Sequence, residues 1–129
     1  MDVTRFSLIV GWTSMIFGAL SGAWIGLSFG DDRWGGGYPA FYRRMLRLGH
    51  IAFFGLGFVN ILFGLSILAI PVSPASARAA AAAFAIAALT MSPCCFMTAW
   101  RRSFRHLFPI PVVSMLAGLT FLLAGWVLR

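Results

Sequence analysis

Long apolar segments, separated by short polar stretches, dominate the pattern of this 129-residue chain. Four of these segments reach the roughly 20 residues that a helix needs to cross the hydrocarbon core of a bilayer. They run over residues 6–29, 50–70, 79–100 and 110–128. The pattern predicts an all-α integral membrane protein, built as a bundle of four transmembrane helices. Too few residues remain for a separate soluble part, so we expect residues 1–129 to form a single transmembrane domain.

The composition supports the same class of protein. Hydrophobic residues make up 60% of the chain and charged residues only 10%, whereas soluble domains carry about a quarter charged residues. The charged residues are ten arginines and three aspartates, which give a formal net charge of +7. Because the apolar segments divide the arginines into small clusters at their ends, the charge indicates a membrane surface with anionic lipids rather than nucleic acid.

Two arginine motifs indicate an orientation in the membrane. "RRMLRLGH" begins at Arg43 and "RRSFRH" begins at Arg101. With four spans, the loops that we assign to these motifs lie on one side, together with seven arginines, against three on the other side. The positive-inside rule then places the motifs in the cytoplasm and both termini outside, as in a bacterial inner membrane. The anchoring residues of the two motifs are Arg43, Arg44, Arg47, Arg101, Arg102 and Arg105.

The recurrence of the motif has two interpretations. The two copies start 58 residues apart, and each half of the chain reads as span, basic loop, histidine and span. A weak parallel repeat could relate two αα-hairpins, as in some transporters. Two independent positive-inside loops would give the same pattern.

Small residues predict close packing between helices. The first span contains glycines at a strict four-residue spacing, which form a groove that another helix backbone can approach. These glycines are Gly18, Gly22, Gly26 and Gly30. In the second span, Gly57 and Gly64 lie on the same arc as His50, and we expect the Asn60 amide to form a hydrogen bond between spans. The pattern does not decide whether the partner of the first span belongs to the same chain.

Three cofactor hypotheses compete for the layer near the inner leaflet. Haem b could be held by His50 and His106, because neutral imidazole is a common axial ligand. A cuprous ion could be held by the soft ligands Met91, Cys94 and Met97. A quinone head group could bind an interfacial histidine and an arginine. Against all three, histidine can be a simple polar anchor, and sulfur side chains can simply fill a core. His50 is the strongest candidate because it lies on the glycine-lined face.

The residues that are missing argue against an autonomous enzyme. The chain has no glutamate for paired-carboxylate catalysis and no lysine for a phosphate-binding loop. The stretch "LRLGHIAFFGLGFVNILFGL" resembles histidine-bearing spans of respiratory and haem-related membrane proteins, which implies a redox context. We therefore expect a small non-catalytic accessory subunit or assembly partner of a larger membrane complex, in particular a respiratory or electron-transfer complex. The alternatives are a protein that itself binds haem, copper or quinone, and a small transporter or channel component.

Overall fold

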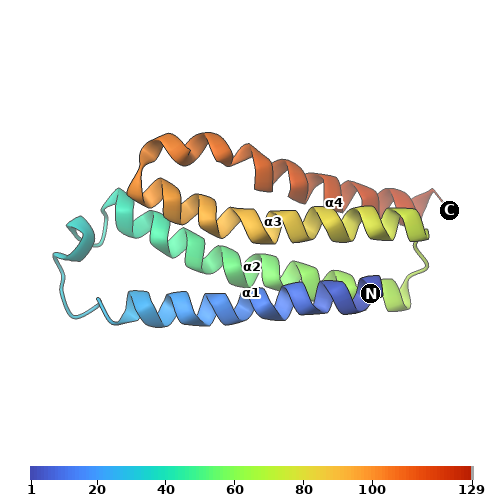
Figure 1. Cartoon of the computed structure of the whole chain (residues 1–129), viewed down its shortest axis with the longest axis horizontal. Helices are drawn as coiled ribbons and strands as arrows, with labels where there is room; N and C mark the ends of the chain where they lie inside the picture. The colour runs from blue at the N-terminus through green and yellow to red at the C-terminus, as the bar shows by residue number, and fades with distance from the viewer. Residues whose placement is uncertain (129) are drawn as a thin grey trace.

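The computed structural model describes residues 1–128, and Arg129 lies outside the described residues. The described chain is all-helical, with both of its ends at the same end of the molecule (Figure 1). The long helices are α1 (Val3–Gly26), α2 (Phe41–Ala69), α3 (Pro74–Trp100) and α4 (Pro109–Val127). Two short 3-10 helices, η1 (Trp34–Gly36) and η2 (Arg102–Leu107), lie in the connections. Four helices, the last counted together with η2, are long and apolar enough to cross a membrane, which confirms the prediction of four such helices.

The second helix begins earlier than the hydrophobic pattern predicts. Helix α2 starts at Phe41 rather than at residue 50. The prediction that Arg43, Arg44 and Arg47 lie in a loop is therefore wrong, because they belong to the first turns of α2. Arginine is a good helix former, and its aliphatic stem can cover apolar surface while the guanidinium group reaches a polar region.

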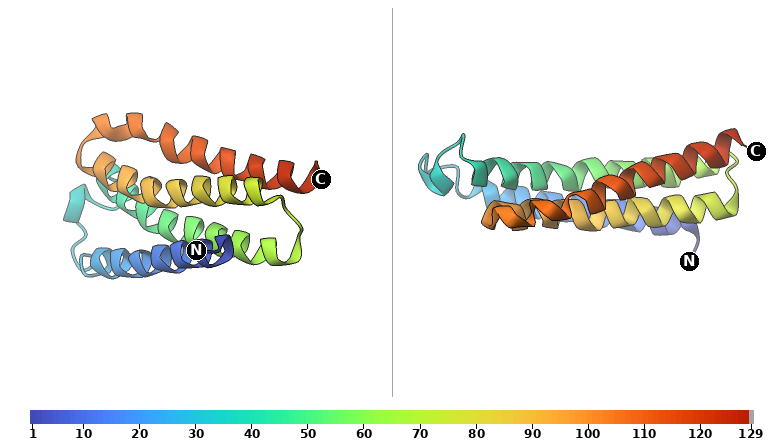
Figure 2. Two further views of the ribbon diagram at one scale, coloured as in Figure 1. Left: turned by 45° about the vertical axis from the view of Figure 1, so that its right-hand side comes forward. Right: turned by 90° about the horizontal axis from the view of Figure 1, so that it is seen from above.

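Helix α3 is the centre of the bundle. The helices α1, α2 and α4 all pack against it, whereas α4 makes close backbone contact with no other long helix in residues 1–128. In an apolar 18-residue window of α3, 56% of the residues are buried. In the corresponding window of the segment that contains α4, only 11% are buried. The alanine tract of α3 presents small side chains on several sides, so three neighbours can approach it closely. The bundle is thus arranged around α3, with α4 attached along one side (Figure 2).

Helices α1 and α2 meet along a seam of small residues. The buried positions of α1 are Ser7, Gly11, Ser14, Gly18 and Ile25. A Cβ atom at Gly18 would lie 2.7 Å from the Phe54 ring, and a Cβ atom at Gly57 would lie 3.0 Å from the Gly11 carbonyl oxygen. Glycine at these positions therefore lets the two backbones approach. The partner of the first span is thus α2 of the same chain.

The seam follows a different row of residues from the predicted groove. Gly22 lies in it, opposite His50, but a Cβ atom at Gly26 would meet only Phe29, at 3.9 Å, and one at Gly30 would meet nothing within 4 Å. Residues four apart drift by about 40° around a helix at each step, so a strict four-residue row leaves a straight contact line. Steps that alternate between three and four residues stay on the contact line, as Ser7, Gly11, Ser14 and Gly18 do. Gly26 is therefore not part of the contact between α1 and α2, and Gly30 lies beyond the end of α1.

Candidate functional site

His50 lies in the interface between α1 and α2. Its Nδ1 atom is 2.9 Å from the Gly18 carbonyl oxygen and 3.1 Å from Ser21 Oγ. A Cβ atom at Gly22 would lie 2.5 Å from the imidazole Cε1, so glycine provides the space for the ring. Because a carbonyl oxygen can only accept a hydrogen bond, this geometry assigns the proton of the His50 ring to Nδ1. The other ring nitrogen, Nε2, then carries the lone pair that could bind a ligand.

The second histidine lies elsewhere in the bundle. His106 is exposed on η2, and among the long helices η2 makes close backbone contact with α3 and α4 only. The ring of His50, in contrast, is held against α1. The two histidines therefore lie in different packing environments, His50 between α1 and α2 and His106 on the exposed surface of η2.

The sulfur side chains spread around α3. Cys94 is buried, Met91 is partly buried and Met97 is 37% exposed, and three-residue steps turn Met91 and Met97 about 120° apart around the helix. Cys95 faces α2, because its Cβ atom lies 3.0 Å from the position that a Cβ atom added at Gly49 would occupy. Both cysteines are free thiols. In the described part of the chain, no group of three or more His, Cys, Asp or Glu side chains could hold a metal ion.

Asn60 links α2 to α3. Its side chain is fully buried, and Nδ2 donates to the Leu56 carbonyl at 2.9 Å and to the Phe84 carbonyl at 3.3 Å. Its Oδ1 atom is buried without a hydrogen-bond partner. The ring of Phe84 packs at 5.2 Å from the ring of Phe63, also on α2. The amide is thus part of the helix–helix contact, and a role in packing explains its burial.

Arg43 is the one charged side chain that is buried in residues 1–128, with 6% of its surface exposed. Its Nη1 atom lies 3.5 Å from the carbonyl oxygens of both Asp32 and Trp34. Its Cζ atom lies 5.5 Å from the ring centroid of Trp34 and 5.6 Å from that of Tyr38. The neighbouring Arg44 is exposed. The Arg-Arg motif in the sequence does not distinguish these two adjacent arginines, although only the first is buried.

Three consecutive glycines shape the loop that covers Arg43. Gly35, Gly36 and Gly37 have φ angles of 63°, 85° and 90°, a region that other residues rarely adopt. A Cβ atom at Gly35 would lie 2.9 Å from Tyr42 Cδ1 and 3.0 Å from Arg43 Cγ. The triplet therefore allows the loop to fold back over the start of α2. This run of glycines was the only signal in the sequence for the buried arginine.

The two arginine motifs meet at one end of the bundle. Arg102 of the second motif places its Cζ atom 4.6 Å from the ring centroid of Phe41, the first residue of α2. Arg47 of the first motif lies 4.1 Å from the Tyr38 ring centroid, and its Nη1 atom donates to the Tyr38 carbonyl at 3.2 Å. The exposed arginines at this end are Arg33, Arg44, Arg101, Arg102 and Arg105. Positive charge is thus concentrated on one end surface.

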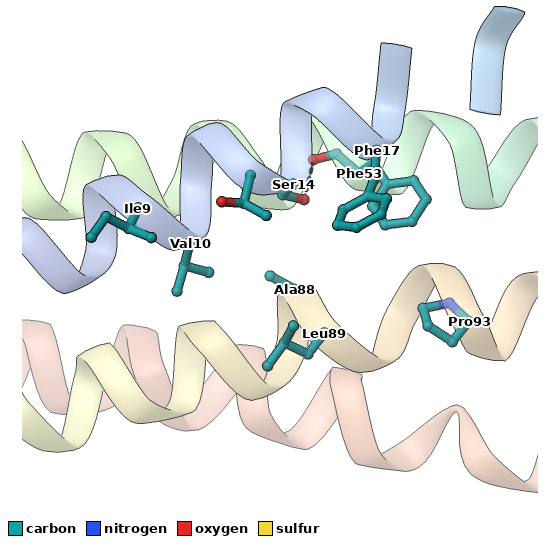
Figure 3. A pocket seen from close by; sticks show the side chains of 9 residues that line it. Ile9, Val10, Ser14, Phe17, Phe53, Ala88, Leu89 and Pro93 are labelled. Atoms are coloured by element: carbon teal, nitrogen blue, oxygen red, sulfur yellow. Dashed lines mark hydrogen bonds between the residues drawn. The ribbon is translucent and has the colours of Figure 1, made fainter. Parts of the chain in front are cut away.

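An apolar groove of about 360 Å³ runs between α1 and α3 (Figure 3). Phe17 of α1, Phe53 of α2, and Leu89 and Pro93 of α3 contribute to its walls. The hydroxyl group of Ser14 donates to the Phe53 carbonyl at 2.7 Å, so it is already engaged. The lining suits an apolar chain and offers little to orient a polar ligand.

No protein-family model, curated protein or solved structure matches this chain. The four apolar helices indicate a membrane protein. The chemistry available to it is a histidine with one oriented nitrogen and an arginine-rich end that contains one buried guanidinium group.

Proposed function

We propose that the chain is an integral membrane protein whose four long helices cross a bilayer, with both arginine motifs on the cytoplasmic side. The length and apolar character of the helices support this proposal. Large apolar side chains cover the outward surfaces, which would be unfavourable in water. The sequence carries seven arginines on the proposed inner side and three on the outer side, as the positive-inside rule requires.

Thiol labelling tests the orientation. In a variant with both native cysteines replaced by alanine, Ala75→Cys at the start of α3 and Ser103→Cys in η2, just after α3, place single thiols at exposed positions. A membrane-impermeant maleimide should label Ala75→Cys in intact cells and Ser103→Cys only after permeabilisation. The reverse result would contradict the orientation, and equal labelling of the two thiols in intact cells would contradict the crossing of the membrane by α3.

Within the membrane, we propose a small non-catalytic accessory subunit or assembly partner of a larger complex of the electron-transfer type. The attachment of α4 to α3 alone among the long helices carries this proposal, since it leaves wide apolar faces on α4 and α1 for partner helices. On α1 the exposed residues include Ile16 and Leu20, and on α4 they include Leu116 and Leu123. The resemblance of residues 46–65 to spans of respiratory proteins supports the electron-transfer setting.

Purification in a mild detergent tests this function. We expect other membrane proteins to co-purify at a fixed stoichiometry. The pair Leu116→Ala and Leu123→Ala alters the α4 face, and the pair Ile16→Ala and Leu20→Ala alters the α1 face. All four side chains are exposed, so the fold should persist. Loss of the complex with only one pair would identify the partner face, whereas a stable, lone wild-type monomer would contradict the proposal.

A second candidate function is the binding of haem or quinone through His50. The hydrogen bond from Nδ1 to the Gly18 carbonyl favours it, since it fixes the ring and leaves the Nε2 lone pair available. Protein ligands to metals are commonly oriented by such a bond to a backbone carbonyl. Nε2 could coordinate iron, or it could accept a hydrogen bond from a quinol hydroxyl group.

An absorption spectrum and a quinone extraction of the purified protein test this candidate. We expect a Soret band, or bound quinone, that is lost in His50→Ala and kept in His106→Ala. The second variant is the matched control because His106 is exposed. Retention of the cofactor by a folded His50→Ala variant would contradict the assignment.

A further inference from the structure

We propose that Arg43, at the N-terminus of α2, binds the phosphate group of an anionic lipid. This inference rests on the membrane insertion proposed above. It distinguishes Arg43 from the other arginines at the same end, which attract anionic lipids only through their general charge.

The charge of Arg43 has no carboxylate partner in the described residues. Asp32 contributes its backbone carbonyl, and the Asp31 carboxylate accepts a hydrogen bond from the Arg33 amide at 2.9 Å. Both contacts of the guanidinium group use Nη1 and are 3.5 Å long, at the weak limit for a hydrogen bond. A buried charge is stable only when it is paired, so the site calls for an anion.

One edge of the Arg43 guanidinium group is free to bind an anion. Nε and Nη2 of Arg43 have no hydrogen-bond partner in residues 1–128, and neither atom is sealed from the surface. These two nitrogens form the edge of arginine that binds two oxygens of a phosphate side by side. Trp34 and Tyr38 flank the group, and such aromatic residues are common at the level of lipid head groups.

The start of α2 adds to the demand for an anion. The residue before the helix, Ala40, offers no side-chain cap, so no side chain satisfies the first-turn amide groups. The positive end of the helix dipole lies here, and Arg43 and Arg44 add further charge of the same sign. A phosphate at this position would reduce the repulsion.

Lipid binding in nanodiscs tests the proposal, with Arg44→Gln as the control of equal charge change. Binding of phosphatidylglycerol would be measured against a phosphatidylcholine background. We expect Arg43→Gln to weaken binding by about tenfold or more, as for the loss of a paired, charge-assisted contact. Arg44→Gln should weaken it by no more than about fivefold, as for one charge near the surface. Arg43→Lys should keep the fold and the charge but not restore binding, because lysine lacks the planar fork.

Other outcomes separate the alternatives. Equal losses in Arg43→Gln and Arg44→Gln, or full recovery in Arg43→Lys, would overturn the proposal. Arg43-dependent binding of inorganic phosphate without binding of phosphatidylglycerol would overturn the lipid assignment in favour of free phosphate. Resistance of the wild-type chain to carbonate extraction is measured first. A chain that inserts but shows no Arg43-dependent binding refutes this inference alone, and a chain that fails to insert refutes insertion as well.

Discussion

His50 Nδ1 lies 2.9 Å from the carbonyl oxygen of Gly18, across the interface between α1 and α2. The Ser21 hydroxyl group donates to the same carbonyl at 2.9 Å. One backbone oxygen, already part of a helix, thus receives two side-chain donors. This polar contact lies in a seam of small residues, where it fixes the orientation of the imidazole ring.

Gly22→Ala tests whether the ring depends on the space beside it. The added Cβ atom would lie 2.5 Å from His50 Cε1, so the ring must move and weaken its bond to Gly18. We expect a loss of about 1–3 kcal/mol in the free energy of unfolding, as for other overpacked sites. Denaturation in mixed micelles, followed by circular dichroism, measures it.

The double variant Gly22→Ala with His50→Ala supplies the control. Without the ring, the methyl group has room, so the two losses should not add. Additive losses would show that Gly22 and the imidazole are not in contact.

Gly57→Ala tests the closest approach of the two backbones. Its Cβ atom would lie 2.9 Å from Met15 Cγ and 3.0 Å from the Gly11 carbonyl oxygen. We expect a loss of about 1–3 kcal/mol in unfolding free energy. Gly55→Ala on the same helix is the matched control, because nothing lies within 4 Å of its Cβ position. Equal unfolding midpoints for Gly57→Ala and Gly55→Ala would contradict the close approach of α1 and α2 at Gly57.

Asn60→Ala tests the polar link between α2 and α3. The variant loses the hydrogen bond to the Phe84 carbonyl, and such interhelical bonds contribute about 0.6–2 kcal/mol in membranes. Truncation of the buried side chain adds to the loss. Ser66→Ala is the control, since its hydroxyl group donates only to Leu62 of its own helix. The same unfolding assay should show a clear shift for Asn60→Ala and almost none for Ser66→Ala, and the opposite order would exclude the link.

The hydrophobic pattern predicts the helices well, but it misses where α2 begins. A run of apolar residues is sufficient to recognise a helix that suits a membrane. The arginines at positions 43–47 lower the local hydropathy without lowering helix propensity, so the pattern marks the limit of the apolar region rather than the start of the helix.

The candidate sites depend on backbone features that side-chain patterns do not display. The partner of His50 is a carbonyl oxygen of Gly18, and the contacts of Arg43 are carbonyl oxygens of a loop. The loop reaches Arg43 because Gly35 and its neighbours adopt positive φ angles. The sequence shows that glycine is present but not which way the chain turns there. The pairing of Gly11 with Gly57 was equally hidden, because it depends on the alignment of α1 against α2.

Gly35→Ala tests the loop that covers Arg43. At a φ angle of 63° an alanine costs about 1 kcal/mol, and its Cβ atom would also press against Tyr42, 2.9 Å away. We expect the loop to open and Trp34 to become more accessible to an aqueous fluorescence quencher. Gly30→Ala is the control, since that position has open space and no positive φ angle. Unchanged quenching in Gly35→Ala would show that the loop does not need this glycine.

Gly118→Ala tests how α4 is held. Because α4 packs against α3 alone among the long helices, its position depends on that single interface. A Cβ atom at Gly118 would lie 2.6 Å from the Phe84 ring, which is fully packed against α2 on its other side. The ring has little room to yield, so α4 should move outward rather than α3 rearrange. We expect faster proteolysis of the connection between α3 and α4 in detergent, with the α1–α2 seam intact. Leu119→Ala, at an exposed position on the same helix, should leave the cleavage rate unchanged. If Gly118→Ala were cleaved no faster than Leu119→Ala, the contact at Phe84 would not be what secures α4.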